Sequence, residues 1–163
     1  MTESKIGGLK LKEHFADNTG KLLIEQYGYK IADTSSMAAS IIKYSLYNEN
    51  KKRLTVVSFI DSDILDFKQS GIIGEMLQKE LNAFKEVFNR DHIVYYKVFV
   101  TDFGLYEDNI GHIIKLYNVA ECSAIIPVVV DLNNNCIIMP DKTNRDCIYF
   151  QEILTQSLES DDD

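Results

Sequence analysis

The residues best suited to chemistry are aspartates that follow apolar segments, namely Asp61, Asp63, Asp102 and Asp131. In an open α/β sheet, ligands bind beyond the carboxyl ends of the strands, so carboxylates that follow strands can converge there. Their oxygens suit a hard divalent cation such as Mg²⁺ or Mn²⁺. These aspartates are therefore candidate metal ligands. The alternative is structural, because aspartate is favoured in turns and helix caps, and Asp131 begins an expected hairpin turn.

Other catalytic arrangements do not emerge from the sequence. A phosphate-accepting aspartate of the receiver type needs an acidic pair, a separate aspartate and a lysine on matching strand ends, and the lysine cannot be placed. The histidines, His14, His92 and His112, have no zinc-ligand spacing. The glycines lack phosphate-loop spacing, and no serine lies in a GxSxG motif. We therefore assign no catalytic residue and no cofactor-binding residue, and expect a chain that is not an enzyme.

Charge and length restrict the classes of partner. The chain has 163 residues, a length typical of one domain. Its formal charge is −8, and Glu159 and Asp161–Asp163 supply four of the negative charges. Nucleic-acid binding depends on Lys and Arg neutralising phosphates, so we expect neither nucleic acid nor an anionic membrane surface as a partner. The longest purely apolar run, Ala124–Val130, is far shorter than the ~20 residues of a membrane-spanning helix.

The cysteines and the N-terminus bear on the compartment. Cys122, Cys136 and Cys147 form no CxxC pair, and disulfide frameworks of small secreted domains usually have an even, denser count. Residues 1–11 contain no apolar stretch, so we expect no secretory signal. The sequence thus favours a reduced, cytoplasmic setting, with all three cysteines packed as small, half-buried apolar residues.

Hydrophobic periodicity predicts four helices and five strands. The expected helices are Leu11–Tyr27, Ile72–Asn89, a short one around 110–117, and Asp146–Leu158. Gly28 is placed to end the first helix in a left-handed conformation, whereas Gly20 weakens its middle and Asp17 or Asn18 could restart it. The expected strands are Ile41–Tyr47, Arg53–Ile60, His92–Val100, Ala124–Val130 and Cys136–Met139.

The resulting order is α-β-β-α-β-α-β-β-α, which indicates an α/β fold with a mixed sheet of about five strands. The long helix should connect two parallel strands, and two hairpins should supply antiparallel pairs. Pro127 cannot donate to a sheet ladder, so its strand should lie at an edge, begin late or place Pro127 at a non-pairing position. A thioredoxin-like fold without redox chemistry is an alternative. We expect a flexible N-terminus over 1–9, one domain over 10–158, and an acidic disordered tail over 159–163.

Several segments together resemble a known domain. They are Tyr27-Gly28-Tyr29, the strand end Ile60-Asp61, the strand end Phe99-Val100-Thr101-Asp102, the hairpin Val129–Ile138, and the helix start Asp146–Phe150. The pattern resembles the N-terminal domain that precedes the membrane region in rhomboid-family intramembrane serine proteases of Gram-positive anaerobes. The resemblance covers roughly Leu11–Leu158.

This resemblance implies a cytosolic domain tethered beside a membrane-embedded protease. The rhomboid Ser–His dyad lies in membrane helices, so no catalytic residue transfers to this chain. Its role would be regulatory, through substrate recruitment, partner docking or ligand sensing, with a protein partner that includes the membrane region of the same chain. Two other hypotheses stay open: a divalent-metal sensor or hydrolase built on the four aspartates, and a stand-alone acidic adaptor or immunity-type protein.

Overall fold

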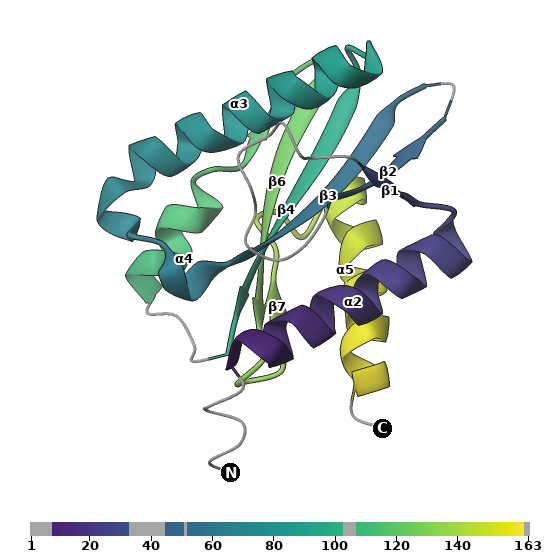
Figure 1. Cartoon of the computed structure of the whole chain (residues 1–163). Helices are drawn as coiled ribbons and strands as arrows, with labels where there is room; N and C mark the ends of the chain where they lie inside the picture. The colour runs from purple at the N-terminus through teal and green to yellow at the C-terminus, as the bar shows by residue number, and fades with distance from the viewer. Residues whose placement is uncertain (1–7, 33–44, 51, 103–106, 162–163) are drawn as a thin grey trace.

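The computed structural model describes residues 8–32, 45–50, 52–102 and 107–161 (Figure 1). The helices in these ranges are α2 (Gly8–Tyr27), α3 (Ser70–Phe88), α4 (Glu107–Ile114) and α5 (Arg145–Asp161). The strands are β1 (Lys30–Ala32), β2 (Ser45–Glu49), β3 (Leu54–Asp61), β4 (Ile93–Thr101), β5 (Asn118–Val119), β6 (Ser123–Asp131) and β7 (Cys136–Ile138). Two 3₁₀-helices, η1 (Ser62–Ile64) and η2 (Phe67–Gln69), follow β3.

The strands form one mixed sheet in the order β1-β2-β3-β4-β6-β5, and β7 also pairs with β6. The central strands β3, β4 and β6 are parallel, and the remaining pairs are antiparallel. Helix α3 connects β3 to β4, and α4 lies between β4 and β6, so both belong to crossovers between parallel strands. The predicted α/β class, the parallel crossover over the long helix and both hairpins are confirmed.

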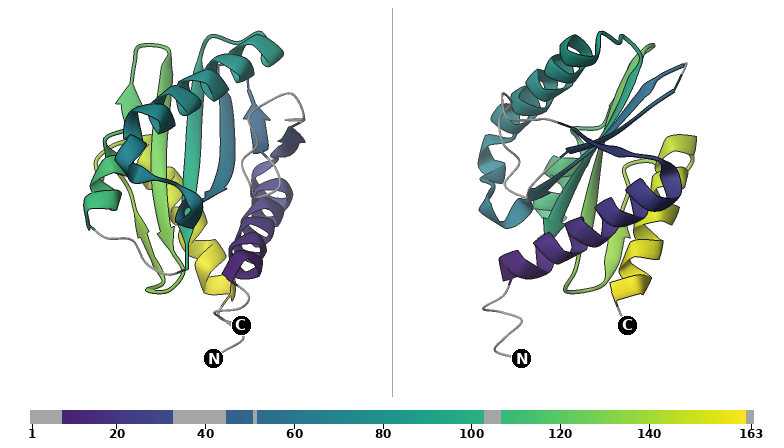
Figure 2. Two further views of the ribbon diagram at one scale, coloured as in Figure 1. Left: turned by 60° about the vertical axis from the view of Figure 1, so that its left-hand side comes forward. Right: turned by 45° about the vertical axis from the view of Figure 1, so that its right-hand side comes forward.

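Helices cover both faces of the sheet. In the right-hand view of Figure 2, α3 lies on one side of the strands, and α2 and α5 lie on the other. Successive residues of a strand point to opposite faces, so β4 contributes Tyr96 and Val98 to the cluster under α2 and α5, and Tyr95 and Phe99 to the cluster under α3. Side chains of both faces therefore hold the parallel strands in place.

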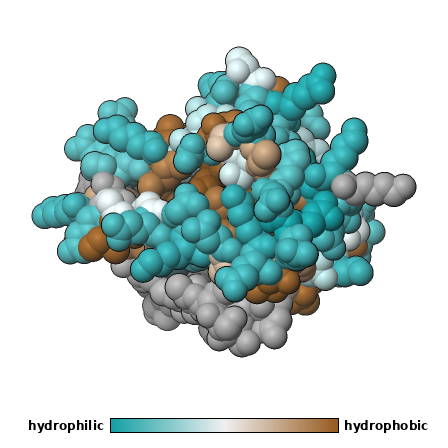
Figure 3. All heavy atoms as spheres, turned by 90° about the horizontal axis from the view of Figure 1, so that it is seen from above, coloured by the Kyte–Doolittle hydropathy of each residue, from teal (hydrophilic) through white to brown (hydrophobic). Residues whose placement is uncertain are grey.

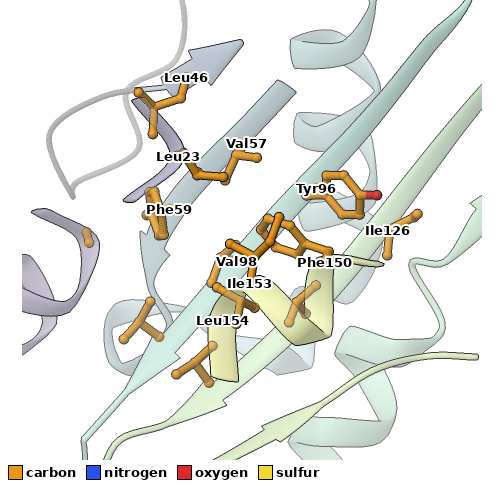
Figure 4. Packing of buried hydrophobic residues seen from close by; sticks show 14 of the residues in the cluster. Leu23, Leu46, Val57, Phe59, Tyr96, Val98, Ile126, Phe150, Ile153 and Leu154 are labelled. Atoms are coloured by element: carbon orange, nitrogen blue, oxygen red, sulfur yellow. The ribbon is translucent and has the colours of Figure 1, made fainter. Parts of the chain in front are cut away.

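The cluster under α2 and α5 shows how closely helix and sheet pack. Figure 4 shows Phe150, Ile153 and Leu154 of α5 turned toward the strands. The rings of Phe150 and Tyr96 stack with centroids 4.1 Å apart. By contrast, hydrophilic residues cover most of the surface seen from above in Figure 3, and hydrophobic residues show mainly in the gaps between them.

The sheet contains more strands than the sequence predicted, because β1 and β5 are only three and two residues long. The strand expected at Ile41–Tyr47 lies partly outside the described residues, and β2 continues past it to Glu49. Glu49 pairs with Leu54, so the turn begins later than expected. Asn50 sets this turn, because its Oδ1 accepts hydrogen bonds from the backbone N–H groups of Lys52 and Arg53.

Helix α2 is continuous, so the predicted interruption near Asp17 and Gly20 is wrong. Gly20 is buried, and the helix passes through it without a new cap. The prediction that Gly28 ends the helix is confirmed, since Gly28 has φ of +74° and the Tyr29 N–H donates to the Leu23 carbonyl.

Pro127 lies within β6, opposite Lys97 of β4. On the other side of β6, β5 pairs with Ala124 and Ile125, and β7 pairs with residues from Val129 onward. Pro127 therefore has a register partner on β4, and on the outer side of β6 it falls between the residues that pair with β5 and with β7. No cis peptide bond occurs among the described residues.

The C-terminal helix is longer than predicted. Helix α5 runs to Asp161, so the first three residues of the expected acidic tail are helical. Within the described ranges, no helix combines the length and the apolar character needed to cross a membrane.

Candidate functional site

Three of the four predicted aspartates meet at the carboxyl edge of β3 and β4. Asp61 ends β3, Asp63 lies in η1, and Asp102 follows β4. The Nζ of Lys12, from the start of α2, lies among them. It is 2.8 Å from Asp61 Oδ1, 2.5 Å from Asp63 Oδ2 and 3.4 Å from Asp102 Oδ1. We call these four residues the Lys12 cluster.

Local hydrogen bonds fix the carboxylates of the cluster. Asp61 caps η1, because its Oδ1 accepts from the backbone N–H of Asp63 at 3.0 Å. The hydroxyl of Thr101, the last residue of β4, donates to Asp63 Oδ1 at 2.6 Å. A backbone N–H of η1 and a hydroxyl at the end of β4 therefore hold the carboxylates at the edge where the parallel strands β3 and β4 end.

The cluster is shielded from solvent. The side chains of Lys12 and Asp61 are 3% and 6% exposed, and that of Asp63 is 17% exposed. Burial by itself lowers the pKa of Lys12, but hydrogen bonds and charge interactions with Asp61 and Asp63 outweigh this effect and raise it. Lys12 is therefore a charged ammonium that neutralises part of the carboxylate charge.

Asp102 is the least satisfied member of the cluster. Its Oδ1 is buried and accepts no hydrogen bond, although it forms an ion pair with the Lys12 Nζ at 3.4 Å. Desolvation raises the pKa of Asp102, Lys12 lowers it, Asp63 raises it further, and the net shift is upward. Three carboxylates face one ammonium, so the cluster has an excess of negative charge when all of its members are ionised.

Asp131 has a different role. Although Asp131 pairs with Thr101 at the end of β6, its carboxylate serves the β6–β7 turn. Oδ1 accepts from the backbone N–H groups of Asn133 and Asn134, and Oδ2 accepts from the Asn134 side chain at 2.7 Å. This is the structural use of an aspartate that the sequence left open as an alternative.

No lysine could be placed beside the aspartates from the sequence, and the structure supplies Lys12 from a helix instead of from a strand end. The helical spacing in the sequence could have indicated the burial of Lys12. Lys12 lies on the inward face of α2 together with Ala16, Thr19 and Leu23. Leu11, the residue before Lys12, is 41% exposed. A lysine at helical spacing from buried positions indicates an internal ion pair.

A second buried charged group lies under α3. Lys97 is fully buried in β4, and its Nζ donates to Glu80 Oε2 of α3 at 3.1 Å. The Tyr95 hydroxyl donates to the same carboxylate. Desolvation lowers the pKa of Lys97, although Glu80 opposes that shift. Because the group is enclosed between α3 and the sheet, its evident role is to join them.

The described histidines, cysteines and acidic residues include no group of three placed to hold a metal ion as the structure stands. Cys122 and Cys136 are exposed and only Cys147 is buried, so the prediction of three half-buried cysteines is wrong for the first two. Burial raises the pKa of Cys147 to about 11.

Helix α5 presents apolar side chains to solvent. Ile148 and Tyr149 are 43% and 36% exposed. The Tyr149 ring packs edge-on against Tyr27 of α2, with centroids 6.1 Å apart. A shallow hollow of about 370 Å³ lies along this helix. We call its lining residues together with Tyr149 the α5 surface, namely Ile148, Tyr149, Gln151, Glu152 and Thr155.

No family model matches the sequence, and no curated protein matches it.

Proposed function

We propose that this chain is a non-catalytic regulatory domain that acts by contact with a protein partner. The observation that carries the proposal is the Lys12 cluster. The side chains best placed for chemistry at the carboxyl edge of the sheet pair with one another and are shielded from solvent. A group that activates a substrate must reach it, whereas these side chains hold α2 against the sheet.

The α5 surface is the part of this proposal that meets the partner. Tyrosine is one of the residue types enriched among the anchors of protein interfaces, and Tyr149 lies at this surface beside the exposed Ile148. Glu152 in the hollow and the charge of −8 favour a partner with basic residues, because opposite charges steer association.

A variant series tests the interaction. The protein is immobilised and incubated with cell extract at low salt, and the retained proteins are identified. We expect Tyr149→Asp to abolish retention of a specific protein, and the control Val87→Asp, on the exposed side of α3, to leave it unchanged. The same retained protein with both variants, no retained protein at all, or turnover of any substrate by the purified chain contradicts the proposal.

The setting proposed for this domain is the cytoplasmic side of a membrane, next to the membrane-embedded part of a rhomboid-like protease. The support is the segment pattern from Tyr27 to Phe150 described above. The test is the reading frame after Asp163. Several apolar segments of ~20 residues support the tethered domain. A stop codon there contradicts it and leaves a stand-alone adaptor.

A divalent-cation sensor is a second candidate, favoured by the buried Asp102 Oδ1 that accepts no hydrogen bond. Such an oxygen is costly unless a cation or a proton compensates it. A cation that binds only the folded state stabilises it by ~2.7 kcal/mol at a hundredfold excess over its dissociation constant.

Thermal unfolding with Mg²⁺ and Mn²⁺ tests this candidate. We expect saturating cation to raise the melting temperature, Asp61→Asn to abolish the rise, and the control Asp141→Asn, which changes an aspartate in a surface turn, to keep it. An unchanged melting temperature in the parent protein rules the candidate out.

A further inference from the structure

The outward face of α5 carries two opposite charges on either side of an apolar centre. Arg145 and Glu152 are exposed, and their positions in the sequence place them two helical turns apart on the same side of the helix. Ile148 and Tyr149 lie midway between them and are 43% and 36% exposed. The face is therefore positive toward its N-terminal end, apolar in its middle and negative toward its C-terminal end.

The fold itself does not pair these two charges. Among the residues that the structure describes, neither Arg145 nor Glu152 belongs to an ion pair, whereas the neighbouring Asp146 pairs with Arg53 at 2.9 Å. In the right-hand view of Figure 2, α5 lies at the outer side of the molecule, across the sheet from α3. Both charged groups are therefore placed to meet another protein.

The order of the groups along α5 is complementary to itself. When two copies of the helix lie antiparallel about a two-fold axis between Ile148 and Tyr149, Arg145 of each copy faces Glu152 of the other. The apolar side chains then meet at the centre of the contact, where tyrosine is a common anchor, and one ion pair flanks them on each side. A parallel arrangement would instead place like charges opposite one another.

We infer that the α5 surface, together with Arg145, pairs with the same surface of a second copy of this chain in a symmetric dimer. The inference rests on the proposed function, in which proteins meet this chain through the α5 surface, and it makes a second copy a competitor for that surface.

The size and charge of the contact indicate a weak dimer. A contact between one helix of each copy lies at the small end of protein interfaces, and those below ~1,200 Å² are typical of transient complexes. The formal charge of −8 on each copy also opposes association, although physiological salt screens charges more than ~8 Å apart. Another partner can therefore displace the second copy from the α5 surface.

Sedimentation velocity over a range of protein concentrations tests the dimer. We expect the apparent mass of the parent protein to rise with concentration from that of one chain toward that of two. Arg145→Glu and Glu152→Arg each replace two attractive contacts by two repulsive ones, so each variant should dimerise about tenfold more weakly. Lys79→Glu and Glu75→Arg make the same changes of charge on the exposed side of α3 and should dimerise as the parent does.

An equimolar mixture of Arg145→Glu and Glu152→Arg supplies the most specific measurement. One copy then carries acidic side chains at both positions and the other carries basic side chains at both, so a mixed dimer regains its two ion pairs. We expect the mixture to dimerise at least as strongly as the parent protein. This recovery also shows that both variants are folded.

Three results overturn the inference: a parent protein that stays monomeric at every concentration, charge reversals on α5 that leave dimerisation unchanged, or a mixture that dimerises no more than its components. The proposed function fails separately, through the retention experiment with Tyr149→Asp. A monomeric parent that retains a specific protein through Tyr149 keeps the proposed function and loses only the dimer. A charge-dependent dimer that retains no other protein keeps the pairing of α5 and loses the contact with another partner.

Discussion

The two buried lysines differ in what surrounds them. Lys12 faces three carboxylates at the edge of the sheet, whereas Lys97 is fully buried and forms an ion pair with Glu80. Removing one partner of a buried ion pair leaves an uncompensated charge, whereas replacing both partners can be nearly neutral. The effect of changing Lys97 or Glu80 on the free energy of unfolding therefore depends on whether the other residue of the pair is still present.

This contrast gives a prediction for the Lys97–Glu80 pair. Lys97→Met should lower the free energy of unfolding by about 3–5 kcal/mol, because the Glu80 carboxylate is then buried without its counter-ion. The double variant Lys97→Met/Glu80→Gln should cost much less, since the amide oxygen still accepts from the Tyr95 hydroxyl. Urea denaturation measures both. Equal losses in the two variants would show that the pair is not coupled.

From the raised pKa of the Cys147 thiol we predict that the free energy of unfolding depends on pH. Its pKa of about 11 in the folded protein is above the ordinary value of 9.0 because the thiol is buried. A raised pKa favours folding below the unfolded-state value, and this contribution disappears as the pH rises toward 11. We expect the free-energy difference between the parent protein and Cys147→Ala to fall between pH 9 and pH 11.

Urea denaturation across this pH range measures the difference, with Cys122→Ala as the control because Cys122 is exposed. The free energy of unfolding of Cys122→Ala should change with pH in the same way as that of the parent protein. A constant difference between the parent and Cys147→Ala would contradict the burial effect.

At the scale of single elements, the end of α2 depends on one backbone conformation. Gly28 has φ of +74°, a region in which L-residues are strained, although a Cβ there would find its nearest neighbour, Asn48 Nδ2, at 3.7 Å. Gly28→Ala should therefore destabilise the fold by about 1–2 kcal/mol through backbone strain alone. Gly71→Ala, in the first turn of α3 with open space around it, should stabilise by about 0.4–1 kcal/mol. Thermal unfolding compares the two variants. Melting temperatures that shift in the same direction would contradict the explanation by backbone strain at Gly28.

Whether a segment forms a helix or a strand could be predicted where the hydrophobic pattern lies within that segment. The stripe of α3 and the apolar runs of β3, β4 and β6 follow from periodicity, and the end of α2 follows from Gly28. Strands β1 and β5 were not predictable, because two or three residues carry no period and form strands only through pairing with β2 and β6.

The same limit applies to the candidate site. The convergence of Asp61 and Asp102 could be expected because parallel strands end at one edge. The use of Asp131 in its own turn could be named only as an alternative, since the choice depends on where Asn133 and Asn134 lie. The position of Lys12 depends on how α2 packs across the sheet, which is a tertiary property that no short sequence window contains.

For the whole molecule, the central strands β3, β4 and β6 belong to both hydrophobic clusters. Each strand sends alternate side chains to α3 on one face and to α2 and α5 on the other. Neither helical layer can therefore lose its packing without exposing apolar side chains of the strands that support the other layer. This arrangement predicts one cooperative unfolding transition for the described fold, as is usual for small domains.

Two phenylalanines on opposite faces test this cooperativity. Phe84 of α3 and Phe150 of α5 are almost fully buried, so either change to alanine should cost about 3–5 kcal/mol. Amide signals of α3 and α5, followed by NMR through a urea titration, should disappear at one midpoint in the parent and at one lower midpoint in each variant. Val87→Ala, on the exposed side of α3, should change stability by less than about 0.5 kcal/mol. If Phe84→Ala lowers the midpoint of α3 but not that of α5, the two layers unfold separately and the shared sheet does not couple them.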